Sequence, residues 1–250
     1  MAGSDSGGGA GIQADLKAFA AAGVHGSSAI VALTAQNTLG VAAVHEVPVA
    51  FVRAQIDAVL DDLGADAVKT GMLFSRRVVE TVADTLAPRR LPLVVDPVML
   101  ASSGAKLLSP DAVGALVGRL FPLATVVTPN LAEAVALAGG PGTRRELAEA
   151  LVGLGAPAAI VTGGHGDPVD HLFDGREHVE IPVERLDVAA THGAGCTHSA
   201  TLAALLALGL PLVEAARGAA RAATDAVRHG HPELGGGDGP VDVLHLKGVT

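Results

Sequence analysis

The hydrophobic residues of this chain fall into two kinds of segment that alternate along its length. Short runs rich in Val, Ile, Leu and Ala are typical of buried parallel strands, and longer segments with apolar residues every three or four positions are typical of helices. The predicted strands are 28–33, 67–69, 93–95, 125–128 and 159–162. The predicted helices are 12–22, 49–60, 76–87, 110–120, 130–138, 143–154, 196–207 and 212–228. This alternation indicates an α/β fold with helices covering a mostly parallel sheet.

The chain reads as one domain over residues 1–250. Its length suits one large α/β domain as well as two small ones, but it has no internal repeat and no linker that marks a boundary. The Gly-rich stretch 230–239 is expected to form a loop. Because parallel strands end at one edge of the sheet, ligands are expected in a cleft at that edge.

Composition excludes several classes of function. Seventeen basic and 26 acidic side chains give a net charge of -9, without the basic stripe that nucleic-acid binding needs. The apolar stretches 18–33 and 199–212 contain Gly or His and are too short for a membrane span. A single cysteine and the lack of a leader pattern predict a cytoplasmic protein.

The only cysteine, Cys196, follows a Gly-Ala-Gly turn and precedes an apolar helix. A helix that starts at such a turn has unpaired N–H groups and a positive dipole end, which together favour an anion. The same position is expected to lower the pKa of a thiol. The alternative is that Cys196 is a small buried side chain and the glycines only cap the helix.

Other glycine-rich signals do not fit known nucleotide motifs. The segment 9–14 matches G-x-G-x-x-A, but no strand precedes it and no acidic residue follows about twenty positions later. The chain contains no Gly-Lys-Ser or Gly-Lys-Thr, so it has no Walker A loop. Asn130 and Glu133 share one face of a predicted helix, where an N-cap with a solvated glutamate is the simpler interpretation.

Six sequence blocks together resemble one family. They are AGSDSGGGAGIQADLK at 2–17 with TAQNT at 34–38, KTGML at 69–73, VVDPVML at 94–100, VTPNLAEA at 127–134, VTGGH at 161–165 and THGAGCT at 191–197. In this order they resemble the hydroxymethylpyrimidine and phosphomethylpyrimidine kinases of thiamine biosynthesis, which belong to the ribokinase-like superfamily. The resemblance implies a three-layer α/β/α sandwich, the use of ATP and Mg²⁺, and a homodimer.

The resemblance also implies roles for individual residues. Cys196 takes the place of an aspartate base, and Gly193, Ala194 and Gly195 would donate N–H groups to the transferring phosphoryl group. The alternative is that Cys196 only orients the substrate. The implied pyrimidine pocket consists of Gln36, Asp15, Ala10, Met72 and Val98. The implied nucleotide contacts are Asn130, Glu133, Thr162 and Gly164, and the implied magnesium ligands are Glu133 and Asp96.

Three interpretations of the substrate site stay open. The first is a kinase that phosphorylates hydroxymethylpyrimidine and then its monophosphate. Gln36 favours it, because a primary amide presents a donor and an acceptor to an aminopyrimidine. The others are a pyridoxal kinase and a non-catalytic pyrimidine-binding regulator, and plain core packing would explain Met72 and Val98.

The start of the sequence departs from the family pattern, because only Met1 precedes the AGSD block. We therefore expect an apolar strand of about 5 to 8 residues upstream of Met1, feeding AGSD as a loop.

Overall fold

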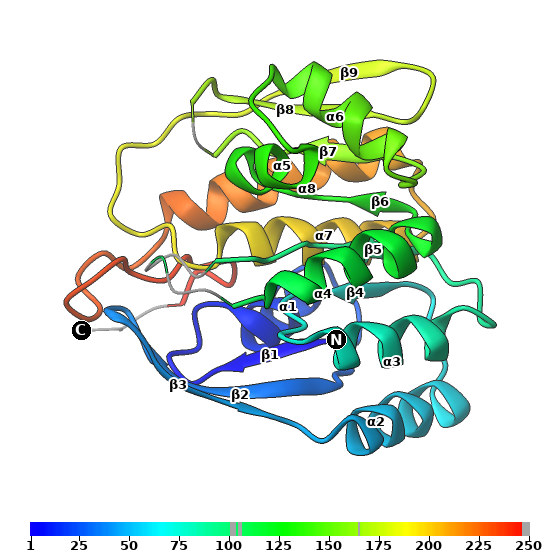
Figure 1. The fold of residues 1–250 in the computed structure, drawn as a ribbon. Coiled ribbons are helices and arrows are strands. Elements are labelled where there is room, and N and C mark those ends of the chain that lie inside the picture. Colours follow the sequence, from blue (N-terminus) through cyan, green and yellow to red (C-terminus); the bar gives the residue numbers. More distant parts are fainter. Residues whose placement is uncertain (101–103, 105–106, 165, 247–250) are drawn as a thin grey trace.

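The strands of the computed structural model form two hydrogen-bonded sheets that lie edge to edge (Figure 1). The structure describes residues 1–100, 104, 107–164 and 166–246. One sheet has the order β1-β2-β3, and the other has the order β4-β5-β6-β7-β8-β9. Their bounds are β1 Ala2–Asp5, β2 Ile30–Asn37, β3 Gly40–Glu46, β4 Val68–Thr70, β5 Leu93–Val95, β6 Val126–Val127, β7 Ala159–Val161, β8 Val169–Phe173 and β9 His178–Pro182.

The centre of this arrangement is parallel. Strand β1 pairs in parallel with β2, and β4 to β7 form a continuous parallel series. Strands β3, β8 and β9 join antiparallel at the two outer edges. The two sheets are linked because the Gly3 N–H donates to Met72 O at 3.1 Å and the Gly71 N–H donates to Met1 O at 3.0 Å. Strand β1 therefore lies beside β4 in the middle of the fold.

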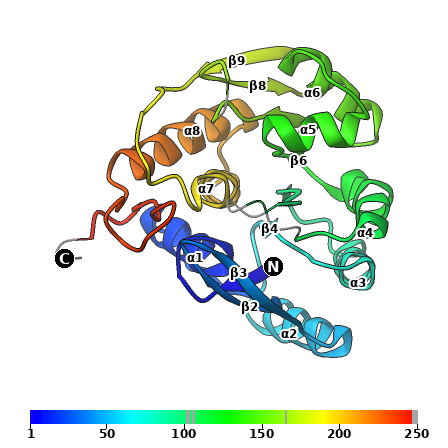
Figure 2. The ribbon, with the colours of Figure 1, turned by 60° about the vertical axis from the view of Figure 1, so that its left-hand side comes forward.

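Helices cover both faces of the sheets (Figure 2). Their bounds are α1 Gly11–Ala21, α2 Val49–Asp62, α3 Arg76–Leu86, α4 Pro110–Ala115, η1 Leu116–Leu120, η2 Phe121–Leu123, α5 Leu131–Ala138, α6 Arg144–Gly153, α7 Ala194–Ala207 and α8 Leu212–Arg228. Figure 2 shows α1, α7 and α8 on one side of the strands and α3 to α6 on the other. None of the helices in the described part of the chain has the length and hydropathy that a membrane crossing needs.

Successive strand residues supply two separate cores, because side chains alternate between the faces of a sheet. Val95 and Val127 belong to the core under helices α2 to α6. Val94, Val126 and Ile160 belong to the core under α7 and α8. Strands β5 to β7 are thus buried on both faces, which explains their uniformly apolar sequence. The helices on both sides of the sheets confirm the expected three-layer α/β/α architecture.

Apart from shifted element bounds, such as β2 at Ile30–Asn37 instead of 28–33, the structure differs from the predicted elements in three places. Residues 2–5, expected to be a loop fed by an upstream strand, themselves form strand β1 between β2 and β4. The predicted helix 110–120 is divided, since its second half adopts wider π-helical turns. The antiparallel strands β3, β8 and β9 were not predicted, because they carry polar or exposed residues such as Asp170 and His45.

The C-terminal segment folds back onto the loop that precedes α7. The His192 N–H donates to Gly239 O at 3.1 Å, and the Val241 N–H donates to His192 O at 3.1 Å. The Thr191 N–H donates to the carboxylate of Asp238 at 2.8 Å. These bonds fix the entry to α7, and residues 230–239 form the loop that the sequence predicts.

Candidate active site

Polar residues from several strands meet where those strands end. Asp5 is the last residue of β1, Asp96 follows β5, and Thr162 follows β7. Asn130, three residues after β6, lies beside Thr162 in an isolated parallel bridge, and the Thr162 N–H donates to Pro129 O at 3.0 Å. This is the carboxyl edge of the parallel strands, so the structure brings these residues to the edge where a ligand cleft is expected.

The glycine-rich loop after β1 is organised by the carboxylate of Asp5. It accepts the N–H groups of Gly7, Gly9 and Ala10 at 2.8, 3.1 and 2.9 Å, and it lies 2.9 Å from Nε2 of His192. Burial by itself raises the pKa of Asp5, but the bonds from His192 and the loop N–H groups outweigh it and lower that pKa. A buried carboxylate therefore holds the loop and ties it to the residue before Gly193.

Helix α7 starts against this loop, at a residue that must be glycine. Gly193 caps the helix with φ +90°, and a Cβ atom there would lie 1.8 Å from the carbonyl oxygen of Gly9. The N–H of Ala194 donates to Thr191 O at 3.0 Å, so this expected donor is engaged within the protein. The first hydrogen bond of the helix is from Thr197 to Gly193 O. Gly195 and Cys196 occupy the first turn, where helix geometry provides no intrahelical acceptor for their N–H groups.

A buried lysine that is not among the predicted site residues lies beneath this helix start. The Lys69 side chain is 1% exposed, and its Nζ lies 2.6 Å from Asp15 and 3.7 Å from Asp96. Burial lowers the pKa of the Lys69 ammonium, but Asp15, Cys196 and Asp96 raise it well above its usual range. The available signal was that Lys69, the first residue of the KTGML block, lies in the predicted buried strand 67–69, where a lysine is rarely found unless its charge is paired.

The thiol of Cys196 does not have the lowered pKa that its position at a helix start predicts. Burial, together with the carboxylates of Asp96 and Asp15, raises the pKa of Cys196 to about 12, although Lys69 and the Gly11 N–H act in the opposite direction. The prediction was wrong because burial disfavours the charged thiolate more strongly than Lys69 and the Gly11 N–H favour it. At neutral pH this group is a thiol.

Two further carboxylates occupy the same edge. Asp96 is buried and accepts the Ser199 hydroxyl at 2.7 Å, and burial raises its pKa in spite of Lys69. Glu133 and Asn130 form a reciprocal capping box at the start of α5. The N-cap part of the simpler interpretation is therefore correct. Glu133 is buried rather than solvated, and burial and the charge of Asp96 raise its pKa to about 8. Two buried carboxylates that disfavour each other's ionisation suit a hard divalent cation, which would relieve that repulsion.

Of the expected pyrimidine-pocket residues, three have polar contacts or cap a helix and two pack in or against the hydrophobic core. Gln36 is half-buried on β2, and the Thr34 hydroxyl donates to its Oε1 at 3.1 Å, which orients the amide. Asp15 is buried and paired with Lys69, and Ala10 caps α1. Met72 and Val98 pack in or against the core under α2 to α6, as plain core packing predicts.

Thr162 and Gly164 follow β7, where a neighbouring carboxylate fixes the backbone. Asp170 on β8 accepts the N–H of Gly163 at 2.6 Å, and its other oxygen lies 3.2 Å from Nε2 of His198 on α7. Gly164 is exposed and Thr162 is half-buried. His198 thus links α7 to the expected nucleotide-binding segment, a contact that no local sequence pattern indicates.

Solved structures match this fold over nearly the whole chain. A Bacillus subtilis pyridoxal kinase in an ADP complex has a TM-score of 0.89 and 38% identity, with 98% of this chain and 96% of that chain covered. A phosphomethylpyrimidine kinase from Clostridium difficile 630 has a TM-score of 0.80 and 38% identity, covering 90% of this chain and 96% of that chain. With the site at the carboxyl ends of the strands, these matches define a kinase with the ribokinase-like fold.

Sequence relatives identify the family within this class. A family model described as phosphomethylpyrimidine kinase matches residues 5–242. A hydroxymethylpyrimidine/phosphomethylpyrimidine kinase of Rhizobium meliloti (strain 1021) is 50% identical over 98% of this chain and 96% of its own length. A thiamine biosynthesis bifunctional protein of Geobacter sulfurreducens is 50% identical over 97% of this chain, which spans 51% of that protein. The chain belongs to the phosphomethylpyrimidine kinase family.

Proposed function

We propose that this protein uses ATP to phosphorylate 4-amino-5-hydroxymethyl-2-methylpyrimidine and then the resulting monophosphate, giving the diphosphate used in thiamine diphosphate biosynthesis. The observation that carries the proposal is the 50% identity to a relative bearing the names of both activities, over 98% of this chain. As part of the proposal the protein is a cytoplasmic homodimer, and its single cysteine suits that compartment.

The proposed phosphate-binding groups are those at the start of α7. The N–H groups of Gly195 and Cys196, the turn at Gly193 and the helix dipole would face the charge on the transferring phosphoryl group. Lys69 lies beneath them in the protein interior, where Asp15 raises the pKa of its ammonium group. Phosphoryl transfer depends mainly on positioning and electrostatic stabilisation, which such fixed groups supply without reorganisation.

We assign Cys196 to the orientation of the attacking oxygen. A thiol with a pKa of about 12 is a poor base at neutral pH. As a neutral side chain in the first turn of α7, it can contact the substrate oxygen without adding a negative charge beside the phosphates. The same contact serves a hydroxymethyl group in the first transfer and a phosphate oxygen in the second.

Asp96 and Glu133 are the proposed ligands of Mg²⁺, which would neutralise phosphate charge when bound. Asn130 holds the Glu133 carboxylate through the capping box, with its N–H 3.0 Å from Oε2. Ser199 holds Asp96 in the same way through its hydroxyl. Thr162 and Gly164, beside Asn130, are the proposed nucleotide contacts.

Gln36 is the proposed determinant of the pyrimidine. The main alternative is pyridoxal, since a Staphylococcus aureus pyridoxal kinase in complex with AMP-PCP and pyridoxal matches with a TM-score of 0.88 and 31% identity. Both substrates are aromatic heterocycles with a hydroxymethyl group, and the amide of Gln36 complements the ring nitrogen and amine of the aminopyrimidine.

The test is ADP release with ATP and Mg²⁺ and, in separate reactions, hydroxymethylpyrimidine, its monophosphate and pyridoxal. We expect higher kcat/KM for both pyrimidines than for pyridoxal. The variant Gln36→Leu is expected to lose about 1 to 3 kcal/mol of pyrimidine binding, because it leaves ring nitrogens unpaired, while the KM for ATP stays unchanged. Preference for pyridoxal in the unmodified protein would refute the pyrimidine assignment, and no turnover of any of the three would refute the kinase.

A further inference from the structure

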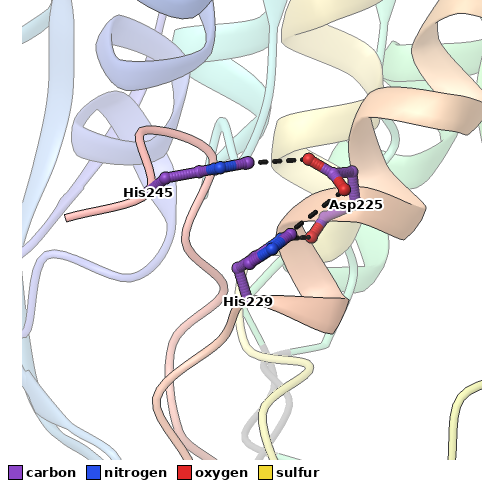
Figure 3. Close-up of side chains that lie close together, drawn as sticks. All are labelled: Asp225, His229 and His245. Atoms are coloured by element: carbon purple, nitrogen blue, oxygen red, sulfur yellow. Dashed lines mark hydrogen bonds and ion pairs between the residues drawn. The ribbon is translucent and has the colours of Figure 1, made fainter. Parts of the chain in front are cut away.

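A second group of chemically active side chains lies away from the kinase site, at the end of α8 (Figure 3). Asp225 and His229 are four residues apart, so they share one face of the last helical turn. His245 reaches the same point from the C-terminal segment, and Figure 3 shows both imidazoles beside the Asp225 carboxylate. One ligand atom from each residue lies within 4.8 Å of the others.

We propose that Asp225, His229 and His245 form a binding site for a divalent transition-metal ion, for which Zn²⁺ is the best chemical fit. Two imidazoles and one carboxylate are a zinc ligand set, with water completing the tetrahedron. Bonds of about 2.1 Å in that geometry separate ligand atoms by about 3.4 Å. Here His245 Nε2 lies 2.8 Å and His229 Nδ1 lies 3.5 Å from the two oxygens of Asp225. Small side-chain movements therefore suffice to admit an ion.

The segment that carries His245 is held in position independently of this contact. The Asp242 N–H donates to Ala226 O at 2.9 Å, which attaches the segment to α8 next to Asp225. The Asp242 carboxylate accepts the N–H groups of Leu244 and Leu246 and so folds the backbone around His245. His245 adopts a φ of +53°, a conformation uncommon outside glycine. The backbone thus presents the imidazole to Asp225 at little further entropic cost.

Other histidine groups in the described residues lack a common point for an ion. His231 directs its two ring nitrogens to different carboxylates, 3.3 Å from Glu233 and 3.2 Å from Asp242. His178 likewise uses one nitrogen toward His171 and the other toward Glu149. A histidine whose two ring nitrogens contact different partners does not bring the ligand atoms of those partners to one point. At Asp225 the ligand atoms of the three residues lie close together.

The present contacts must rearrange in two ways when an ion binds. His229 Nδ1 now lies 2.9 Å from the backbone oxygen of Asp225, so its proton must move to Nε2 before Nδ1 can bind an ion. Arg228 lies 3.1 Å from Oδ1 of Asp225 and competes with a cation for the carboxylate. Removal of this arginine charge should therefore tighten metal binding, which a purely structural hydrogen-bond cluster does not predict.

The experiment is calorimetric titration of the full chain, without a polyhistidine tag, with ZnCl₂, together with the visible absorption of the Co²⁺ form. We expect one ion per chain. His245→Gln should weaken binding roughly tenfold to a hundredfold or more, given that even outer-shell substitutions have effects of this size. His25→Gln, at an exposed histidine outside the cluster, should not change it.

Two further variants make the outcome decisive. Arg228→Gln should bind Zn²⁺ more tightly than the unmodified protein, and His178→Gln should bind it equally well. Zn²⁺ should also raise the Tm of the unmodified chain but not that of His245→Gln, because the ion joins α8 to the C-terminal segment. Unchanged affinity in His245→Gln, or loss of binding in His178→Gln instead, would overturn the assignment. None of these measurements depends on the kinase activity.

Discussion

Replacement of Lys69 by methionine tests whether the buried charges under α7 form one structural unit. Methionine keeps most of the volume of the lysine stem but leaves Asp15 and Asp96 without their shared cation. Removing one partner of a buried ion pair typically costs about 3–5 kcal/mol, because the remaining charge is desolvated and unpaired. For a chain of this size, each kcal/mol lowers Tm by about 2–4 °C, so Lys69→Met should lower it by about 6–20 °C.

The assay is thermal and urea unfolding of a double-mutant cycle at pH 7. Asp15→Leu alone leaves Lys69 near Asp96, and the double variant removes the closest pair, whose atoms are 2.6 Å apart. We expect the double variant to be more stable than Lys69→Met, since it buries one fewer unpaired carboxylate. Arg76→Met is the matched control, because Arg76 and Glu80 are 2.7 Å apart but lie at the surface, where ion pairs contribute little.

Two results would refute this reasoning about Lys69. One is a loss of stability no larger than that of Arg76→Met. The other is a double variant no more stable than Lys69→Met, since it would show that the unpaired Asp15 is not the source of the loss. The kinetics provide a separate readout: if the Lys69 charge supports phosphate binding, Lys69→Met should also raise the KM for ATP at a temperature where the protein stays folded.

Three other predictions follow from the site. Cys196→Ala should reduce kcat/KM by similar factors for the pyrimidine alcohol and for its monophosphate; a much larger loss for the alcohol, which alone must shed a hydroxyl proton, would show that Cys196 is a base. Because the pKa of Asp5 is lowered in the fold, its contribution is present above its unfolded pKa of about 3.8 and is lost as pH falls through the lower folded value. Asp5→Asn should therefore lower Tm at pH 6, with a difference from the unmodified protein that shrinks below pH 4; a difference independent of pH would contradict this. Gly193→Ala should lower Tm more than Gly209→Ala in thermal unfolding, since both residues have positive φ but only Gly193 would place its Cβ against another backbone atom; equal losses would contradict the close approach to Gly9.

The parts of the fold that the sequence predicts are those with a strong local cause. Strand β5 and helix α8 have the predicted bounds, because the first is a short apolar run and the second has a regular apolar face. Strand β8 escapes prediction because Asp170 and His171 are polar in sequence but buried in the fold. Their burial depends on contacts with His198 and His178, 28 and 7 residues away, and a pattern of hydrophobic and polar positions reports neither contact.

In the candidate site, too, the features with a local cause can be predicted and those that depend on tertiary contacts cannot. The glycine at 193 and the capping pair Asn130 and Glu133 can be predicted, because turn and helix-start chemistry are local. The pKa of Cys196 cannot be predicted in this way. The direction of its shift depends on the burial of the thiol and on three charged groups from α1, β4 and the end of β5. A local rule considers the helix dipole and omits burial, which has the largest effect on the pKa of this thiol.

The neutral state of Cys196 has a physical rationale in the charges around it. Lys69 supplies one positive charge against the carboxylates of Asp15 and Asp96, so a thiolate would add to an excess of negative charge in a region of low dielectric. The same excess would repel ATP if only side chains bound it. In the proposed function, the N–H groups of α7 and a cation at Asp96 and Glu133 would hold the phosphates instead, and both are compatible with a protein of net charge -9. A neutral thiol at position 196 therefore adds no further electrostatic repulsion to phosphate binding.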